Sequence, residues 1–560
     1  MLCSRSTPAR GALLPAGVAA LLLACGGASA PERAGAGTPT EEPAASTESP
    51  AGPPADLTLR VDTTRDRAPI SPWIYGVGDV DITPELLRGR EHVFTFQRLG
   101  GNRTTTYNWE NNASNAGSDY HHINDAHFGA TDEPAAAVVA FVERAHGMGD
   151  AALVTVPIID RVAADKDGGD VIETPDFVNR RFHRNVARSP NGQPRLPPDR
   201  SDGVVYQDAY VRTLERRFGT GQGPGLFYSL DNEPGGWTTT HPRIRGGDGS
   251  ADLTYAEHLR RSVEFASAIR AEAPRALIFG PASFGFADFM RLGFAPDHNN
   301  RDYVEVYLQR MARAEREGGK RLLDVLDVHF YSSADLDGQP IGPLTGAAAE
   351  DLRMQLPRSL YDPTYEEPSW IVRDFLHEPI QLLPRLQRLI DRHYPGTGIA
   401  ITEYHYGGGA DIGGGVTQAD ILGAYARHGV KAASLWPVVF LPQQYVIGAF
   451  EMYRRREGPF GDVAVHAETP DVARINVWAS VGQDDGRVVA VVVHRARETA
   501  TVALDVRHPT PLTSGAAIRL DAQGPEPRPA GDGEVRRTGD RHVVRLTSVG
   551  PSVTTVILRP

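Results

Sequence analysis

Cysteine is almost absent from this chain of 560 residues, and its scarcity excludes several kinds of chemistry. The only two cysteines, Cys3 and Cys25, lie within the first 25 residues. We therefore expect the folded part of the protein to contain no disulfide, no cysteine nucleophile and no thiolate-bound metal ion. A membrane-spanning run is also missing, because the N-terminal apolar stretch at 11–23 is too short to cross a bilayer as a mature helix.

An excess of positive charge is missing as well. The chain has 58 Lys and Arg residues against 70 Asp and Glu residues, so its formal net charge at pH 7 is -12. Such a surface repels nucleic acid and anionic lipid, and neither is expected as a partner. With 41% hydrophobic and 23% charged residues, the composition is that of a soluble globular protein, and the length suggests two or three domains.

The first 55 residues have the features of a targeting segment followed by a tether. Arg5 and Arg10 precede the apolar stretch, which ends in the residues LLACG at 22–26 and resembles a bacterial lipobox. This pattern predicts a lipoprotein signal peptide at 1–24, lipidation of Cys25 and a flexible Pro/Ala/Gly/Ser/Thr tether at 25–55. Ordinary signal cleavage after Ala30 is the alternative. Both predict an exported protein, found at the cell surface or outside the cell. Only the lipoprotein keeps Cys25, and its lipid anchor would be the only contact with the membrane.

Eight short, continuously apolar runs recur from residue 70 onward, each followed by polar or glycine residues and then by a helical stretch. Continuous rather than alternating hydrophobicity predicts strands that are buried on both faces, as in a parallel sheet. Eight such units over 70–462 predict an α/β fold, the (β/α)8 TIM barrel. A doubly wound sheet is the alternative, but no glycine-rich phosphate loop follows any run. The runs are 73–77, 93–96, 152–159, 226–230, 276–279, 325–330, 398–401 and 432–439.

Two helix starts can be identified between these runs. Thr254 is followed three residues later by Glu257, and this capping box predicts a helix that continues to about residue 273. Thr417 predicts the start of a second helix, which ends near residue 429.

The C-terminal part of the chain has a different pattern. Residues 463–560 contain β-rich runs without helical signals, which predicts a β-sandwich of about a hundred residues. Residues 56–69 include an alternating segment at 57–61, and we expect this N-terminal strand to join the sandwich.

Two of the eight apolar runs end in a glutamate. The fourth is followed by Asp231-Asn232-Glu233-Pro234, and the seventh by Thr402-Glu403. In such barrels the chemistry lies at the C-terminal ends of the strands, and strands four and seven face each other across the mouth. A retaining glycosidase needs one protonated and one ionised carboxyl group about 5–5.5 Å apart. We therefore predict that Glu233 and Glu403 are the catalytic pair; salt-bridged surface glutamates are the alternative.

Other strand ends supply side chains around this pair. Arg98 follows the second run, and an arginine beside a nucleophilic carboxylate keeps it ionised; a purely structural salt bridge is the alternative. His329 and Tyr331 end the sixth run, and the tyrosine hydroxyl can donate to the same carboxylate. Asn232 can bind the 2-hydroxyl group of the sugar.

Aromatic side chains near these strand ends are candidates for stacking on pyranose rings. Packing in the protein interior is the alternative for each of them. The predicted substrate-binding residues are Trp109, Trp237, Tyr404, Tyr406 and Trp436.

No metal site is assigned from the sequence, and no cofactor is expected to be required. Asp79, Asp81, Asp119 and Asp160 offer oxygen ligands near strand ends, so a structural calcium ion is an open alternative. However, no run of ligands with the spacing of a calcium-binding loop occurs.

The order of these strand-end residues resembles the clan of retaining glycosidases that includes cellulase family 5. Longer segments resemble glycoside hydrolase family 44, the endoglucanase and xyloglucanase family, and the similarity spans about residue 56 to the C-terminus. The segments are YSLDNEP at 228–234 with Trp237 and HP at 241–242; RLGGNR at 98–103 with YNW at 107–109; NNASNAGSD at 111–119; RSLYDPTY at 358–365 with SWI at 369–371; and ITEY at 401–404 with QADI at 418–421.

The resemblance implies that Glu233 is the general acid/base and Glu403 the nucleophile of a secreted retaining endo-β-1,4-glucanase. The substrate would be cellulose, xyloglucan or mixed-linkage glucan, bound in an open cleft, and a monomer is expected. An exo-acting β-glycosidase and a non-catalytic glycan-binding lipoprotein are the alternatives, and the intact carboxylate pair argues against the second. Two departures, His405 in place of the usual asparagine and the glycine-rich segment at 407–415, leave the subsite preference open.

Overall fold

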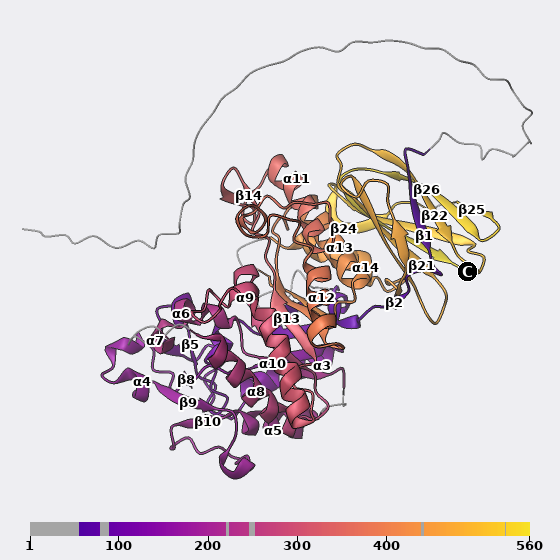
Figure 1. The fold of residues 1–560 in the computed structure, drawn as a ribbon. Helices are drawn as coiled ribbons and strands as arrows, with labels where there is room; N and C mark the ends of the chain where they lie inside the picture. Colours follow the sequence, from indigo (N-terminus) through magenta and orange to yellow (C-terminus); the bar gives the residue numbers. More distant parts are fainter. Residues whose placement is uncertain (1–54, 79–88, 220–222, 246–252, 438–441, 532–533) are drawn as a thin grey trace, which may run out of the picture. The chain divides into compact units, whose positions relative to one another are not determined.

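The computed structural model describes residues 55–78, 89–219, 223–245, 253–437, 442–531 and 534–560. The predicted signal peptide, Cys25 and nearly all of the predicted tether lie outside these residues. Within the described residues the chain forms a closed barrel, a seven-stranded antiparallel sheet and a five-stranded mixed sheet, besides three small sheets of two or three strands (Figure 1). No helix in this part of the chain has the length and the hydropathy needed to span a bilayer.

Eight parallel strands close into a barrel in the order of the sequence, which confirms the predicted fold class. Each of the eight apolar runs overlaps one of these strands. Large side chains such as Phe96, Phe227 and Phe279 fill the barrel near the N-terminal ends of its strands. The strands are β3 (Gly76–Gly78), β4 (Phe96–Leu99), β7 (Ala151–Val156), β11 (Leu226–Leu230), β12 (Ile278–Ser283), β13 (Val325–His329), β16 (Gly398–Tyr404) and β17 (Ala432–Leu435).

Helices follow most of the strands. The main ones are α3 (Ala136–Met148), α5 (Gln207–Phe218), α8 (Tyr255–Glu272), α10 (Tyr303–Gly318), α11 (Ala347–Gln355), α12 (Leu382–His393), α13 (Ile412–Arg427) and α14 (Gln444–Arg454). Thr254 caps the start of α8 by accepting from the backbone N–H of Glu257 at 3.1 Å, but the Glu257 side chain pairs with Arg245 instead of completing the capping box.

The start predicted at Thr417 for the second of the two helices is wrong. Helix α13 begins at Ile412, and Asp411 caps it by accepting from the backbone N–H of Gly414 at 3.3 Å. Thr417 lies inside the helix, where its hydroxyl donates to the carbonyl of Gly413 at 2.7 Å. Glycines are unfavourable in helices, but the first turn of α13 is buried, and a Cβ atom at Gly414 would lie 2.1 Å from the carbonyl oxygen of Gly408.

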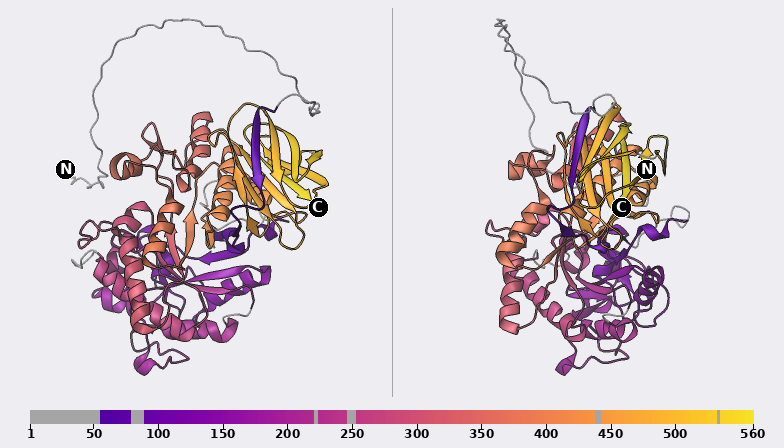
Figure 2. Two further views of the ribbon diagram at one scale, coloured as in Figure 1. Left: turned by 45° about the vertical axis from the view of Figure 1, so that its right-hand side comes forward. Right: turned by 90° about the vertical axis from the view of Figure 1, so that its right-hand side faces the viewer.

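The C-terminal region forms two sheets that pack face to face (Figure 2). The N-terminal strand β1 belongs to the five-stranded sheet, where it pairs in parallel with β22. That sheet has the order β19 (His466–Glu468), β1 (Leu57–Asp62), β22 (Ala500–Arg507), β26 (Arg541–Ser548) and β25 (Val535–Thr538). The seven-stranded sheet has the order β2 (Ala68–Pro69), β18 (Val463–Ala464), β20 (Ile475–Val481), β21 (Val488–His494), β27 (Ser552–Arg559), β23 (Ser514–Asp521) and β24 (Gly524–Pro529).

Strand β21 of the seven-stranded sheet is buried on both faces. On β21, Val488, Ala490 and Val492 point into the sandwich core, whereas the alternate residues 489, 491 and 493 belong to the same apolar cluster as the barrel helices. Helix α13 approaches this face closely, since a Cβ atom at Gly423 would lie 2.0 Å from the ring of Trp478. The barrel and the sandwich therefore share an extensive apolar interface.

Candidate active site

The two predicted catalytic glutamates face each other at the C-terminal ends of the barrel strands. Glu233 lies just beyond the end of β11, and Glu403 is the residue before the last one of β16, Tyr404. One carboxylate oxygen of Glu233, one of Glu403 and a ring nitrogen of His329 all lie within 4.8 Å of one another. This spacing leaves room for one glycosidic bond between the two carboxyl groups.

Glu403 is held by a cation and a hydroxyl group. The Nη1 atom of Arg98 lies 2.5 Å from Oε1 of Glu403, and the hydroxyl group of Tyr331 donates to Oε2 at 3.0 Å. Arg98 is completely buried, and its second amino group donates to Oδ1 of Asn232 at 2.6 Å. The guanidinium group thus places a positive charge beside Glu403 and fixes the orientation of Asn232. It is both a buried salt bridge and a direct neighbour of the carboxylate pair.

Glu233 lies in a different environment, which keeps its proton bound. Burial raises the pKa of Glu233 to about 7, the negative charge of Asp119 adds to this rise, and Arg98 opposes it. The Nδ1 atom of His329 lies 2.8 Å from Oε1 of Glu233. Burial lowers the pKa of His329 to about 3, so its ring is neutral and supplies no positive charge to the pair. Near neutral pH Glu233 can therefore carry a proton.

The turn that carries Glu233 is strained and is held by its neighbours. Asp231 and Glu233 have φ values of 64° and 47°, a left-handed conformation that is uncommon for residues other than glycine. The buried carboxylate of Asp231 accepts from the backbone N–H groups of Ile158 and Ile159, the latter at 2.9 Å, and from that of Asn232 at 2.8 Å. These bonds join the end of β11 to the chain after β7 and compensate for the strain.

Glycines beside Arg98 make room for the site. A Cβ atom at Gly100 would lie 2.3 Å from the guanidinium carbon of Arg98. Gly101 has a φ of 89°, and its backbone N–H donates to Oδ1 of Asn232 at 3.2 Å. In the RLGGN sequence, the first glycine is therefore needed because a side chain would clash with Arg98. The second is needed because its φ is unfavourable for other residues.

Four of the five predicted stacking residues are buried, which contradicts their expected role at the cleft surface. Trp109, Trp237 and Tyr404 have at most 1% of their surface exposed, and Tyr406 has 5%. Trp237 instead donates from its indole N–H to the carbonyl of Asn232 at 3.0 Å, and so supports the turn before Glu233. The rings of Trp109, Tyr404 and Tyr406 pack in the apolar core. The elements that cover them come from distant parts of the chain.

Trp436 remains a candidate for binding sugar. Its side chain is only partly buried, and it lies at the strand ends, where Cβ atoms at Gly78 and Gly101 would each lie 2.9 Å from its ring. Both glycines therefore allow the indole to lie close to the backbone at the ends of β3 and β4.

Buried acids near the pair were missed by the sequence analysis. Asp327 on β13 accepts from the hydroxyl of Thr402 at 2.7 Å, and burial raises its pKa to about 7. Burial also raises the pKa of Asp288 to about 7, and Glu233 contributes to this rise. An acidic residue within an apolar run marks Asp327 in the sequence, but no comparable pattern marks Asp288, which lies in a short helix after β12.

The aspartates considered for calcium form no ligand cluster in the described part of the chain. Asp119 accepts from the side-chain amide of Asn102 at 3.1 Å, and Asp160 lies 3.1 Å from the guanidinium of Arg245. Asp79 and Asp81 lie outside the described residues. Among the described residues, the one group of three or more His, Cys, Asp or Glu side chains with metal-ligand spacing is Glu233, His329 and Glu403, the carboxylate site itself.

A closed parallel barrel with paired carboxyl groups at the ends of its fourth and seventh strands has the architecture of the barrel glycosidases. Comparison with known proteins places the chain more narrowly, because residues 113–334 match the model of glycoside hydrolase family 44. A Paenibacillus polymyxa xyloglucanase of that family, solved with xyloglucan, is 35% identical with a TM-score of 0.81, over 90% of this chain and 99% of the other. The chain belongs to glycoside hydrolase family 44.

Two curated relatives are longer proteins. Endoglucanase A of Paenibacillus lautus is 38% identical over 463 residues, which cover 78% of this chain and 63% of the relative. A protein of Caldicellulosiruptor saccharolyticus named β-mannanase/endoglucanase A is 34% identical over 511 residues, which cover 85% of this chain and 37% of that protein. The chain therefore corresponds to only part of the length of either relative.

Proposed function

We propose that this protein is a retaining endo-β-1,4-glucanase that cleaves cellulose-like or xyloglucan-like chains by double displacement. The observation that carries the proposal is the pair formed by Glu233 and Glu403, with oxygen atoms within 4.8 Å and with opposite electrostatic environments. An inverting enzyme needs a wider separation, about 6.5–9.5 Å, to fit a water molecule between the carboxyl groups.

In the first step, Glu403 acts as the nucleophile. One of its carboxylate oxygens attacks the anomeric carbon of the sugar, and the bond from that carbon to the glycosidic oxygen breaks. Glu233 transfers its proton to the departing oxygen, so the leaving chain departs as an alcohol. Arg98 and Tyr331 hold the carboxylate of Glu403 in position, and Asn232, fixed by Arg98, binds the sugar 2-hydroxyl group.

In the second step, Glu233 acts as a base. It removes a proton from a water molecule, whose oxygen attacks the anomeric carbon and releases Glu403 as a carboxylate. The two inversions leave the product with the β configuration of the substrate. Because His329 is neutral, it does not compete as a proton donor, and it can orient Glu233 through the contact at Nδ1.

The choice of substrate is supported by the names of the relatives. The matched proteins are named endoglucanase, β-mannanase/endoglucanase and xyloglucanase. On this basis we propose a polysaccharide with a β-1,4-linked backbone as the substrate. The test is to assay purified protein on cellulose, xyloglucan, mixed-linkage glucan, mannan and xylan, with viscosity and product size as readouts. Rapid viscosity loss on a β-glucan supports internal cleavage. Release of only short products from chain ends would favour an exo-acting enzyme.

The stereochemistry of the product tests the mechanism directly. Proton NMR of the first product formed should show the β-anomer before mutarotation produces the α-anomer. An initial α-product would overturn the double displacement and the assigned role of Glu403.

We also propose that the protein is exported and anchored through a lipid on Cys25, on the basis of the lipobox-like sequence at 22–26. Replacing Cys25 with Ala should release the protein from the membrane fraction without changing its specific activity. Fractionation and immunoblotting of the two forms are the measurement. A mature N-terminus at Pro31 would contradict the lipid anchor.

A further inference from the structure

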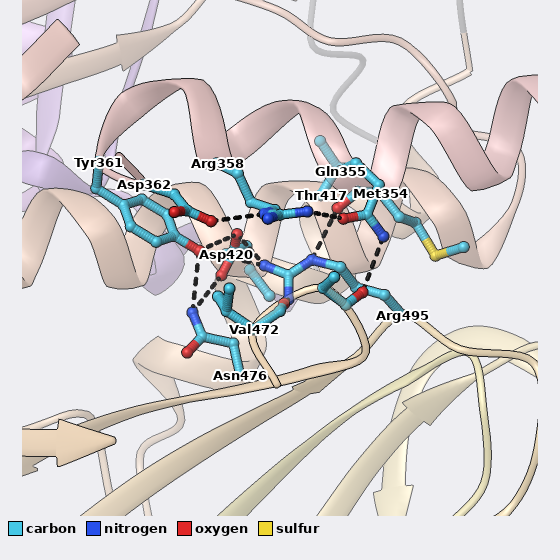
Figure 3. Close-up of polar contacts among 12 residues, drawn as sticks. Met354, Gln355, Arg358, Tyr361, Asp362, Thr417, Asp420, Val472, Asn476 and Arg495 are labelled. Carbon is cyan, nitrogen blue, oxygen red and sulfur yellow. Dashed lines mark hydrogen bonds and ion pairs between the residues drawn. The ribbon is translucent and has the colours of Figure 1, made fainter. Parts of the chain in front are cut away.

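Arg495 is a buried residue of the β-sandwich whose side chain contacts two elements of the barrel (Figure 3). It lies between β21 and β22, and its Nη2 atom lies 2.5 Å from Oδ2 of Asp420 on α13. Its Nε atom donates to the carbonyl of Met354, in the last turn of α11, at 2.9 Å. One planar guanidinium group therefore connects α11, α13 and the sandwich.

The carboxylate of Asp420 is fully hydrogen-bonded at this interface. Besides Arg495 it accepts from the indole N–H of Trp478 at 2.9 Å, from the amide of Asn476 at 3.2 Å and from the hydroxyl of Tyr361 at 3.2 Å. A buried ion pair is a weak source of stability, since well-packed apolar residues often hold two surfaces together as well or better. What this group of directional bonds adds is a defined position for the two barrel helices.

The residues beside these contacts hold the chain that follows Glu403. Arg353, next to Met354, donates from Nε to the carbonyl of Tyr406 at 3.0 Å. Gln418, two residues before Asp420, donates to the hydroxyl of Tyr404 at 2.9 Å. Arg495 thus contacts α11 and α13 at the points from which these helices hold the residues directly after the catalytic glutamate.

We propose that Arg495 is a positioning residue for Glu403, so that the sandwich takes part in catalysis by fixing the nucleophile. Through Met354 and Asp420 it sets the spacing of α11 and α13, and through Tyr404 and Tyr406 that spacing sets the end of β16. Arg495 itself touches no substrate. The inference rests on the proposed role of Glu403 as the nucleophile.

The test uses Arg495→Lys in the full chain. Lysine keeps a positive charge beside Asp420, but its single ammonium group cannot also donate to the Met354 carbonyl in the geometry of the guanidinium fork. The readout is inactivation by 2,4-dinitrophenyl 2-deoxy-2-fluoro-β-cellobioside, which traps the glycosyl-enzyme. Its good leaving group needs no proton, so the inactivation rate reports nucleophilic attack alone. We expect the rate at saturation to fall about fivefold or more, with the half-saturating concentration changed less than about twofold.

Val492→Ala is the matched control, because this residue on β21 is buried in the sandwich core and touches neither barrel helix through its side chain. It should lower the melting temperature while leaving the contacts of Arg495 in place, and it should leave the inactivation rate unchanged. If Arg495→Lys does not fold, Tyr361→Phe replaces it. That variant removes only the hydroxyl that donates to Asp420 and accepts from Arg495 at 3.3 Å, and a smaller decrease in rate is expected.

The outcomes separate the two proposals. If mass spectrometry finds no label on Glu403 of the wild-type protein, the proposed function has failed. If the wild type is labelled there and Arg495→Lys, or Tyr361→Phe in its place, reacts at the wild-type rate, the positioning role is overturned. The same conclusion follows if Val492→Ala slows inactivation as much as the test variant. A decrease confined to the variants of the Arg495 network supports the inference.

Discussion

The ends of β11 and β16 carry the same residue, a glutamate, in contrasting surroundings. At β16, Glu403 contacts the guanidinium of Arg98 and the hydroxyl of Tyr331. At β11, Glu233 contacts a neutral histidine, and its proton is retained up to about pH 7. The comparison shows that the role of a carboxyl group in this site is set by its neighbours rather than by its own chemistry. Four substitutions test how far this division extends.

The largest effect is expected when the nucleophile is removed. Glu403→Gly should lower turnover on every substrate by more than about 10⁴-fold, because no covalent intermediate can form. Azide can enter the vacated space and attack an activated β-cellobioside, giving the α-glycosyl azide. Product analysis by NMR is the measurement. A β-azide from this variant would reverse the two assignments.

Loss of the acid should affect substrates unequally. Glu233→Ala is expected to lower turnover on polysaccharides by about 10²–10⁴-fold, because a sugar alkoxide needs a proton to depart. The first step on a dinitrophenyl cellobioside should be nearly unaffected, since that leaving group needs no proton. Rapid-mixing kinetics should show a preserved burst of dinitrophenol, and azide should yield the β-product. Equal losses on both substrates would mean that Glu233 is not the acid.

Substitution of the shared arginine should have an intermediate effect. Arg98→Lys keeps the charge but cannot contact Glu403 and Asn232 with two separate amino groups, so one charge-assisted hydrogen bond is lost. We expect a decrease in kcat of about 10-fold, from the loss of about 1.5 kcal/mol. Kinetics together with thermal melting is the measurement. A folded variant with normal turnover would limit Arg98 to a structural role.

The smallest effect concerns the pH profile. Activity requires protonated Glu233, so kcat/KM should decrease as the pH rises through about 7. The negative charge of Asp119 disfavours ionisation of Glu233, and Asp119→Asn should therefore move this alkaline limb to lower pH. Asp471→Asn, at an exposed site in the sandwich, is the control with the same change in net charge. If the alkaline limb of the pH profile is identical in the wild type and in Asp119→Asn, then Asp119 does not raise the pKa of Glu233.

The barrel and the positions of the two glutamates were predictable because they depend on local patterns. Continuously apolar runs mark buried parallel strands, and a glutamate directly after such a run lies at the mouth of a barrel. The surroundings of each aromatic ring were not predictable in this way. Trp237 follows the catalytic turn in sequence, yet whether its ring faces a cleft or supports Asn232 depends on elements brought together only by the fold. Similarly, burial overrides the poor helix propensity of the glycines at the start of α13.

The position of β1 has a consequence for how the chain is assembled. Leu57 pairs with Val502, so a strand near the beginning of the described chain is completed only by residues that are made almost 450 positions later. Contacts so distant in sequence are slow to form, because the ends of a very long loop must first meet. We therefore expect the five-stranded sheet to close after the barrel strands have paired. Variants shortened past residue 57 should fail late in folding, as collapsed chains with a formed barrel and an open sheet edge.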